Sequence, residues 1–353
     1  MKNDIAVLIP QVPGASQILS YLLQIDENKI YSNFGPLNSQ LKHRLASYCG
    51  VDKTLIATCS NATLAIQGLL ETDVADSSEW SVPVWTFTAT ASASIKSGRN
   101  VSFVDAKEDW RPNFITRNPS GSILDVAPFG DSIDLDSIIA CKSMVIDAAP
   151  SFDAVQQISL HNKFPIAIVV SMHATKLLPA GEGAFVISNC HDWITKFEAW
   201  TNFGMDSQRQ SQFVGTNAKL SEYAAAVALA SLDNWNATRT SMLKLGTRLK
   251  KLTEDFGFEV APAMKRGLAT PYWIVDLKSP ERKNKLVELC NDHSIGWRNW
   301  WNQGIHHMPA YSKLTLGNFE VCDSISARTL GLPFHFKLTE EEIARIESVL
   351  SQI

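Results

Sequence analysis

Short apolar runs, several of them rich in β-branched residues, recur through the first half of the chain and alternate with segments of mixed polarity. The runs span residues 54–58, 101–105, 122–126, 144–146, 165–170 and 184–188. The run at 165–170 is apolar throughout, as expected of a strand that is buried on both faces of a sheet. Strands that alternate with longer segments are typical of a mostly parallel sheet. The pattern therefore predicts an α/β fold.

Two later stretches have helical patterns. Residues 221–252 are rich in Ala and Leu, and we interpret them as one long helix that carries the chain out of the sheet. Thr339 and Glu342 have the spacing of a capping box, and apolar side chains follow at helical spacing, which predicts a structural helix over 339–353. At 353 residues the chain is long enough for two domains. We expect a major domain over residues 1–235, N-terminal segment included, and a smaller C-terminal α+β domain over 236–353.

Composition narrows the class of protein. Hydrophobic residues make up 45% of the chain and charged residues 19%, the balance of a globular protein. The net charge is −4 without a long basic run, so we expect no nucleic-acid partner. The six cysteines are scattered, which predicts reduced thiols and no metal site. We see no signal peptide and no run of about 18 apolar residues, so we expect a cytoplasmic protein without a membrane partner.

One lysine has a setting that suits covalent chemistry. Lys176 follows the buried strand predicted at 165–170 and precedes a Gly-Glu-Gly segment at 181–183. Ligands of open α/β sheets bind just beyond strand ends. A lysine whose neighbours favour the neutral amine forms a Schiff base with a carbonyl cofactor such as pyridoxal 5′-phosphate (PLP). Most lysines are solvated surface groups, however, so this position alone is a weak signal.

Three further features supply what a PLP site needs, and each has a structural alternative. Asp147 ends the strand at 144–146 and could keep the pyridine nitrogen protonated, or simply cap a helix. The segment 60–63 opens a helix whose first amides and the Thr63 hydroxyl suit a phosphate, unless Ser60 or Asn61 only caps that helix. Aromatic side chains in 83–90 suit stacking on a planar ring, although for Trp85 we prefer core packing.

With these residues in place, the chain resembles the DegT/DnrJ/EryC1/StrS aminotransferases, PLP enzymes that aminate keto sugars attached to nucleotides. The resemblance runs nearly from end to end and implies their fold, PLP-dependent aminotransferase fold type I, as in aspartate aminotransferase. The matching segments are, in order, residues 31–36, 60–65, 86–91, 146–149, 171–183, the pair 202–204 and 215–222, and 326–342.

The resemblance implies roles for individual residues. Lys176 forms the imine with PLP, and Asp147 pairs with the pyridinium nitrogen, so these two are the expected catalytic residues. The remaining expected cofactor contacts are phosphate contacts at the helix start, a stacking ring, a strand-end hydroxyl and an amide handed to the neighbouring subunit of a homodimer. These contacts fall, in that order, on Asn61, Ala62 and Thr63, on Phe87, on Ser171 and on Asn217.

The chain departs from the family pattern in a few places. Pro150 stands where many members carry a Gln that hydrogen-bonds the cofactor's ring oxygen. Proline has no side-chain donor, so that contact is absent or comes from another residue, of which Ser151 is the nearest. Ala62 and Ala184 replace glycines, and both are small enough to keep a close backbone approach. A related branch that dehydrates deoxysugars carries His in place of the Schiff-base lysine, so Lys176 argues against that branch.

The segment 297–308 is rich in aromatic and basic residues and matches the family's substrate side. We expect substrate contacts from Arg298, Trp300 and His306, and from Asn33 and Gly35 in the entry motif. An indole can stack on a sugar or base, and a guanidinium can pair with a diphosphate or a carboxylate. The alternatives are that the indoles pack between domains and that the histidines are solvated or packing residues.

The resemblance implies transamination with L-glutamate as amino donor. The expected acceptor is a nucleotide-linked keto-deoxysugar, foremost a dTDP-4-keto-6-deoxyhexose, and the aminosugar would serve O-antigen, other polysaccharide or natural-product biosynthesis. A 3-keto sugar aminotransferase and a PLP-dependent sugar lyase or dehydratase on the same fold remain alternatives. A non-catalytic PLP or sugar-nucleotide binding protein is disfavoured by the intact pair of Lys176 and Asp147.

Overall fold

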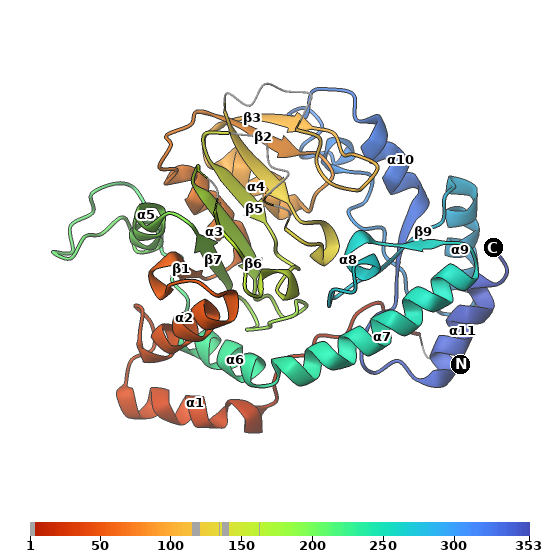
Figure 1. Ribbon diagram of the computed structural model, residues 1–353, viewed down its shortest axis with the longest axis horizontal. Coiled ribbons are helices and arrows are strands. Elements are labelled where there is room, and N and C mark those ends of the chain that lie inside the picture. The colour runs from red at the N-terminus through yellow and green to blue at the C-terminus, as the bar shows by residue number, and fades with distance from the viewer. Residues whose placement is uncertain (1–3, 115–120, 134, 136–140, 162) are drawn as a thin grey trace.

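A computed structural model describes residues 4–353 apart from 115–120, 134, 136–140 and 162. Its centre is a seven-stranded sheet with the order β1-β7-β6-β5-β4-β2-β3 (Figure 1). The strands are β1 (Ile56–Cys59), β2 (Glu79–Pro83), β3 (Asn100–Val104), β4 (Ser122–Val126), β5 (Met144–Asp147), β6 (Ile166–Ser171) and β7 (Ala184–Ser188). All but β2 fall on runs that the sequence predicts, within a few residues.

The sheet is mostly parallel, which confirms the predicted fold class. The pairs β2–β3, β2–β4, β4–β5 and β5–β6 are parallel, whereas β7 runs antiparallel to both β6 and β1. The first strand begins later than predicted because Lys53–Leu55 form a 3₁₀ turn. The Asp52 carboxylate accepts a hydrogen bond from the Thr54 amide at 2.8 Å and so stabilises that turn.

Helices cover both faces of the large sheet. The helices α3 (Ala62–Glu71), α4 (Thr88–Lys96) and α5 (His191–Thr201) share one hydrophobic core with alternate strand residues such as Val145 and Val169. The helices α1 (Ala15–Asn28), α2 (Pro36–Cys49) and α6 (Glu222–Asp233) share a second core with the intervening residues, among them Ile146 and Ile168. Burial on both faces explains why the central strands are apolar throughout.

A smaller antiparallel sheet with the order β10-β9-β8 lies in the C-terminal part of the chain. Together with flanking helices it encloses a third core, which also contains Ile5. The Ile5 amide donates to Ser294 O and the Phe334 amide to Val7 O, both at 2.9 Å, so the N-terminal segment packs beside the C-terminal region (Figure 1). The boundary after residue 235 stays a prediction. The elements of this part are α7 (Trp235–Asp255), β8 (Glu259–Val260), α8 (Pro262–Lys265), β9 (Trp273–Asp276), α9 (Pro280–Asp292), α10 (Glu320–Arg328), β10 (Thr329–Leu332) and α11 (Glu340–Leu350).

Two helix predictions had different outcomes. The single helix expected over 221–252 is wrong, because α6 ends at Asp233 and α7 begins at Trp235. At the junction, the Asn234 side chain donates to Ala230 O at 2.9 Å. This bond gives that carbonyl a partner other than a backbone amide of a continuing helix. The capping box before α11 is confirmed, since the Glu342 amide donates to the Thr339 hydroxyl and the Thr339 amide donates to the Glu342 carboxylate.

Two composition-based expectations can be compared with the structure. All six cysteines are free thiols, and burial raises the pKa of Cys49 to about 12. Across the described ranges, none of the helices is long and apolar enough to cross a membrane.

Candidate active site

The carboxyl ends of the neighbouring parallel strands β5 and β6 bring the two expected catalytic residues to one cavity of about 640 Å³. Asp147 is the last residue of β5. Lys176 follows β6 by five residues, and its amide closes a tight turn by donating to His173 O at 2.9 Å. The other predicted residues that line the cavity are Asn61, Ala62, Thr63, Phe87, Ser171 and Trp300.

Asp147 is buried without a bonded cation. Its side-chain oxygens accept hydrogen bonds from the Thr90 hydroxyl at 2.6 Å and from the Ala149 amide at 3.1 Å. Burial raises the pKa of the carboxyl, and these two bonds together with the charge of Lys176 oppose that rise only in part. No salt bridge to Asp147 occurs among the described residues. A buried charge of this kind needs a cation nearby to compensate it. A protonated pyridine nitrogen in the cavity would be such a cation.

Lys176 is likewise free of a salt bridge within the described part of the chain. Its Nζ donates to the Tyr272 hydroxyl at 2.5 Å and lies 5.1 Å from the centre of that ring. A lysine that is not held by a carboxylate keeps its amine available for a carbonyl group. Tyr272 was not among the predicted residues, because it lies 96 positions further along the chain and no local motif marks it.

The start of α3 forms another part of the cavity wall. The Asn61 side chain accepts a hydrogen bond from the Leu64 amide at 2.9 Å, so it caps the helix, as the structural alternative held. The amides of Ala62 and Thr63 lie in the first turn, where no intrahelical carbonyl is available to them. These amides and the helix dipole suit a phosphate, whereas the Asn61 side chain is already engaged.

The aromatic residues divide as the sequence indicates. Phe87 stands before α4 with 52% of its surface exposed and lines the cavity, so its ring is open to stacking. Trp85 is a core residue, because it is 2% exposed and packs edge-on against Trp110, Phe129 and Trp301.

These features fit PLP. A buried carboxylate, an amine without an ion-pair partner, free amides at a helix start and an open aromatic ring line one cavity. The one contact that many family members have and this chain lacks is not replaced by Ser151. Its hydroxyl is fully buried, has no described hydrogen-bond partner and does not line the cavity, while Pro150 does.

Several predicted residues lie outside this cavity. Asn217 is exposed, and its side chain accepts a hydrogen bond from Lys219 at 2.8 Å. Arg298 is exposed, with its guanidinium 5.8 Å from the Trp300 ring. Asn33 is exposed, and Gly35 precedes α2, where a Cβ atom would lie 2.6 Å from Glu222 Cδ.

The requirement for glycine at position 35 has a structural cause that the sequence did not reveal. Glu222 is buried, and its carboxylate accepts hydrogen bonds from the Leu37 and Asn38 amides at 2.7 and 2.9 Å. This carboxylate therefore caps α2 from α6 and needs the space that Gly35 leaves.

His306 also lies outside the cavity. His306 and His307 each place Nε2 within 2.9 Å of the same Asp323 carboxylate oxygen. Possible ligand atoms of these three residues lie within 4.8 Å of one another, so they could hold a metal ion. Asp323 satisfies the two Nε2 atoms without an ion, whereas the buried Nδ1 of His306 has no described partner. The expectation of no metal stays a prediction.

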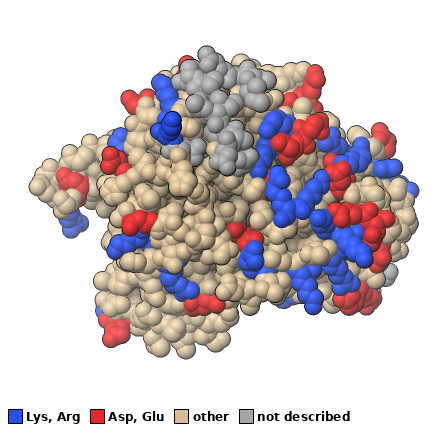
Figure 2. Space-filling model, in the orientation of Figure 1, with Lys and Arg blue, Asp and Glu red and all other residues tan. Residues whose placement is uncertain are grey.

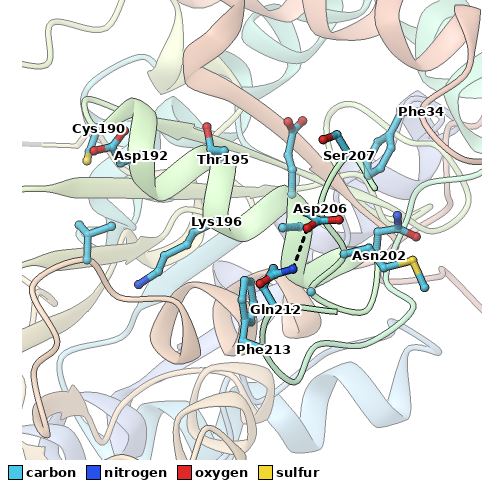
Figure 3. A pocket seen from close by; sticks show the side chains of 15 residues that line it. Phe34, Cys190, Asp192, Thr195, Lys196, Asn202, Asp206, Ser207, Gln212 and Phe213 are labelled. Atoms are coloured by element: carbon cyan, nitrogen blue, oxygen red, sulfur yellow. Dashed lines mark hydrogen bonds between the residues drawn. The ribbon is translucent and has the colours of Figure 1, made fainter. Parts of the chain in front are cut away.

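A second, larger hollow of about 800 Å³ is open to solvent between α5 and the loop 202–213 (Figure 3). Phe34 lines it next to Ser207, and the Gln212 side chain donates to Asp206 at 2.7 Å within the loop. Neither Asp147 nor Lys176 lines this hollow. It is therefore separate from the cavity that Asp147 and Lys176 share.

Comparisons with known proteins give a consistent picture. The sequence profile of the DegT/DnrJ/EryC1/StrS aminotransferase family matches residues 14–351. A dTDP-4-amino-4,6-dideoxy-D-glucose transaminase of Shigella dysenteriae is 25% identical over 373 aligned positions, which cover 100% of both chains. GDP-perosamine synthase of Caulobacter vibrioides is 23% identical and covers 99% of this chain and 98% of its own.

Solved structures share the fold. The crystal structure of DesI in the presence of its TDP-sugar product superposes with a TM-score of 0.84 at 24% identity. The superposition covers 100% of this chain and 93% of DesI. At this identity the likeness shows the fold alone.

Proposed function

Because this chain belongs to the DegT/DnrJ/EryC1/StrS aminotransferase family and is thus a PLP-dependent aminotransferase, we propose that it transfers the amino group of L-glutamate to a nucleotide-linked keto-deoxysugar. The observation that carries the proposal is the shared cavity of Asp147 and Lys176, in which the lysine amine has no described carboxylate partner. The names of the Shigella and Caulobacter relatives point to sugars attached to nucleotides. Of these, the first favours dTDP-4-keto-6-deoxyhexose as acceptor.

The residues around the cavity divide the work. PLP, when bound, supplies the carbonyl and the electron-withdrawing ring on which an amino group is carried from donor to acceptor. Asp147 holds a proton on the ring nitrogen, and Thr90 orients the carboxylate. Lys176 holds the cofactor and moves protons at its Nζ. The amides of Ala62 and Thr63 bind the phosphate.

Aromatic side chains form the sugar side of the cavity in this proposal. Trp300 and Trp301 both line the cavity, and the Trp301 ring stacks on Phe129 with 4.3 Å between centroids. An apolar wall of this kind suits the carbon face of a deoxysugar, which lacks one hydroxyl group. A 3-keto sugar would contact the same apolar wall, so it remains the second candidate acceptor. A lyase, the other alternative, would require no amino donor.

We also propose a homodimer in which Asn217 completes the partner's phosphate site. The segment that carries Asn217 also exposes apolar surface, with Val214 92% exposed and Phe203 43% exposed. Tyr31 and Phe34, in the matched segment 31–36, and Tyr223, directly after the segment 215–222, are exposed as well. Figure 2 shows charged side chains intermingled over the C-terminal part of the chain and few over the remaining face. Exposed apolar side chains on a segment with few charges favour an interface between subunits.

The first test follows the visible absorbance of the PLP-loaded protein. L-Glutamate should bleach the band of the lysine-bound cofactor, and subsequent addition of dTDP-4-keto-6-deoxyglucose should restore it and yield an aminosugar by mass spectrometry. Lys176→Ala should lack the band. If the band survives glutamate, the lyase or dehydratase alternative replaces this proposal.

Subunit complementation tests the dimer and the role of Asn217. Lys176→Ala and Asn217→Ala protomers would be coexpressed with different affinity tags. If Asn217 acts across the interface, each mixed dimer holds one intact site, and a random mixture regains about a quarter of the wild-type sites. No regain of activity would place Asn217 in its own protomer's site or outside both. The product's use in a polysaccharide or natural product, and the cytoplasmic location, stay expectations.

A further inference from the structure

Tyr272, in the C-terminal part of the chain, contacts the side-chain amine of Lys176. Its hydroxyl lies 2.5 Å from Lys176 Nζ, and Tyr272 is only 9% exposed. The ring packs edge-on against Phe129 and Trp300, with 5.9 and 5.1 Å between centroids. Thr270, two residues before Tyr272, is anchored as well, because its hydroxyl donates to Phe129 O at 2.5 Å. The hydroxyl of Tyr272 is therefore held in place by its surroundings.

We propose that Tyr272 is the positioning residue of Lys176, whose free amine it holds in the cavity whenever that amine is not bonded to the cofactor. The proposal rests on the PLP-dependent aminotransferase function and depends on neither the identity of the sugar nor that of the amino donor.

The chemistry of the two groups supports this role. A lysine side chain has four rotatable bonds and loses up to about 2 kcal/mol of conformational freedom when it is fixed. One hydrogen bond to an anchored hydroxyl restrains the amine near the reacting atoms, which favours each step in which it must attack or move a proton. Without it, the amine can swing away from the cavity, because none of the described carboxylates forms a salt bridge with it.

A phenol also suits a group whose charge changes during turnover. The hydroxyl can accept a hydrogen bond from an ammonium group and can donate one to a neutral amine. The contact therefore persists in both protonation states of Lys176, whereas a carboxylate would hold the lysine as a fixed ion pair. The aromatic face, 5.1 Å from Nζ, adds a further attraction in the charged state.

The test measures how fast the apoprotein captures PLP, followed by the appearance of the visible band after rapid mixing. Tyr272→Phe keeps the ring that packs against Phe129 and Trp300 and removes only the hydroxyl. We expect capture to be about 10- to 100-fold slower, the loss of one hydrogen bond to a charged group. In steady state kcat should fall while KM for both substrates stays unchanged. Tyr21→Phe is the matched control, because its hydroxyl bonds Asp233 at 2.8 Å, away from the cavity, and should leave both rates unchanged.

A second background separates positioning from direct contact with the cofactor. In Lys176→Ala, which can bind PLP only noncovalently, the added Tyr272→Phe change should leave the PLP dissociation constant unaltered, as measured by equilibrium dialysis. Capture by Tyr272→Phe at the wild-type rate would overturn the proposal, and so would an equal loss of affinity in both backgrounds. If wild-type protein captures PLP but no glutamate reaction follows, the proposed donor fails while the role of Tyr272 stands.

Discussion

Asp147→Asn should lower kcat by at least about a hundredfold and at the same time stabilise the apoprotein. The substitution keeps the shape and removes the charge of a side chain that is 4% exposed. The hydrogen bonds can adapt, because Thr90 donates its one proton to Asp147 and accepts from the Thr86 hydroxyl at 2.7 Å. In the variant, Thr90 would accept from the new side-chain amide and donate to Thr86. Each of these side chains keeps a hydrogen-bond partner, so the main change is the loss of the buried charge.

The magnitude follows from the two states of the site. In the loaded enzyme, the proposed pairing of Asp147 with the pyridinium is a buried ion pair, and the Asn variant would break it at a cost of about 3–5 kcal/mol. At about 1.4 kcal/mol for each factor of ten, kcat should fall by about 10²- to 4 × 10³-fold. In the apoprotein the carboxylate has no bonded cation, and burial raises its pKa. A raised pKa in the folded state means that ionisation opposes folding, so this cost grows as pH rises from the unfolded pKa through the folded one.

The assay compares urea unfolding of the apoproteins at several pH values with steady-state rates of the loaded enzymes. Wild-type apoprotein should lose stability relative to Asp147→Asn as pH rises from acidic to neutral, and PLP should restore more stability to the wild type than to the variant. A variant apoprotein that is less stable than the wild type at neutral pH would contradict the cost assigned to the buried charge. A loaded variant that keeps more than about a tenth of kcat would contradict the proposed role of Asp147.

Three other changes test separate parts of the molecule. Gly204→Ala should destabilise the segment that carries Asn217, because Gly204 has φ +68° and a Cβ atom would lie 2.0 Å from Phe213 O. Limited proteolysis should cut this segment faster than in the wild type, and equal rates of cutting would contradict the predicted strain. Thr339→Ala removes the cap of α11 and should cost about 1 kcal/mol in urea unfolding without a change in kcat, whereas lost activity would contradict its purely structural role. Burial lowers the pKa of Lys283 to about 8, so the wild type should gain stability as pH rises between about 8 and 10, the range in which the unfolded chain binds the extra proton. Lys283→Met should remove that slope, and a slope that persists would assign it to another group.

The sheet and the cofactor end of the site were predictable because both depend on local sequence. A strand buried on both faces needs an apolar run, and the run before Lys176 is β6 itself. Two such strands side by side and parallel must place their carboxyl ends together, so Asp147 and Lys176 share a cavity once the strands pair. By contrast, β2 was missed because its sequence, Glu-Trp-Ser-Val-Pro, includes a charged residue and a proline. Similarly, the break between α6 and α7 was missed because the Ala- and Leu-rich composition on either side outweighed Asn234, whose side chain bonds back to Ala230 O.

The rest of the site depends on contacts between residues far apart in the chain. Thr90 reaches Asp147 across 57 positions, and Tyr272 reaches Lys176 across 96. Neither contact leaves a periodic pattern or a motif of fixed spacing, so no reading of neighbouring residues reveals it. The same limit applies to His306, which an aromatic and basic segment suggested for substrate but which the fold directs to Asp323 on α10.

The polar groups around the cavity fall into two kinds, and the difference indicates where the cofactor acts. Asn61, Thr86 and Thr90 have partners within the protein, so they shape the site without needing a ligand. The charge of Asp147 has no bonded cation, and the first amides of α3 have no carbonyl acceptor within the helix. The Lys176 amine has only the neutral Tyr272 hydroxyl as its described hydrogen-bond partner. Leaving such groups incomplete costs stability, which a protein retains where a ligand supplies the missing partner. Since Pro150 adds no donor to the ring, the hold on PLP must come mainly from these incomplete groups, and the loss of any one should weaken cofactor binding more than the loss of a residue that is already paired.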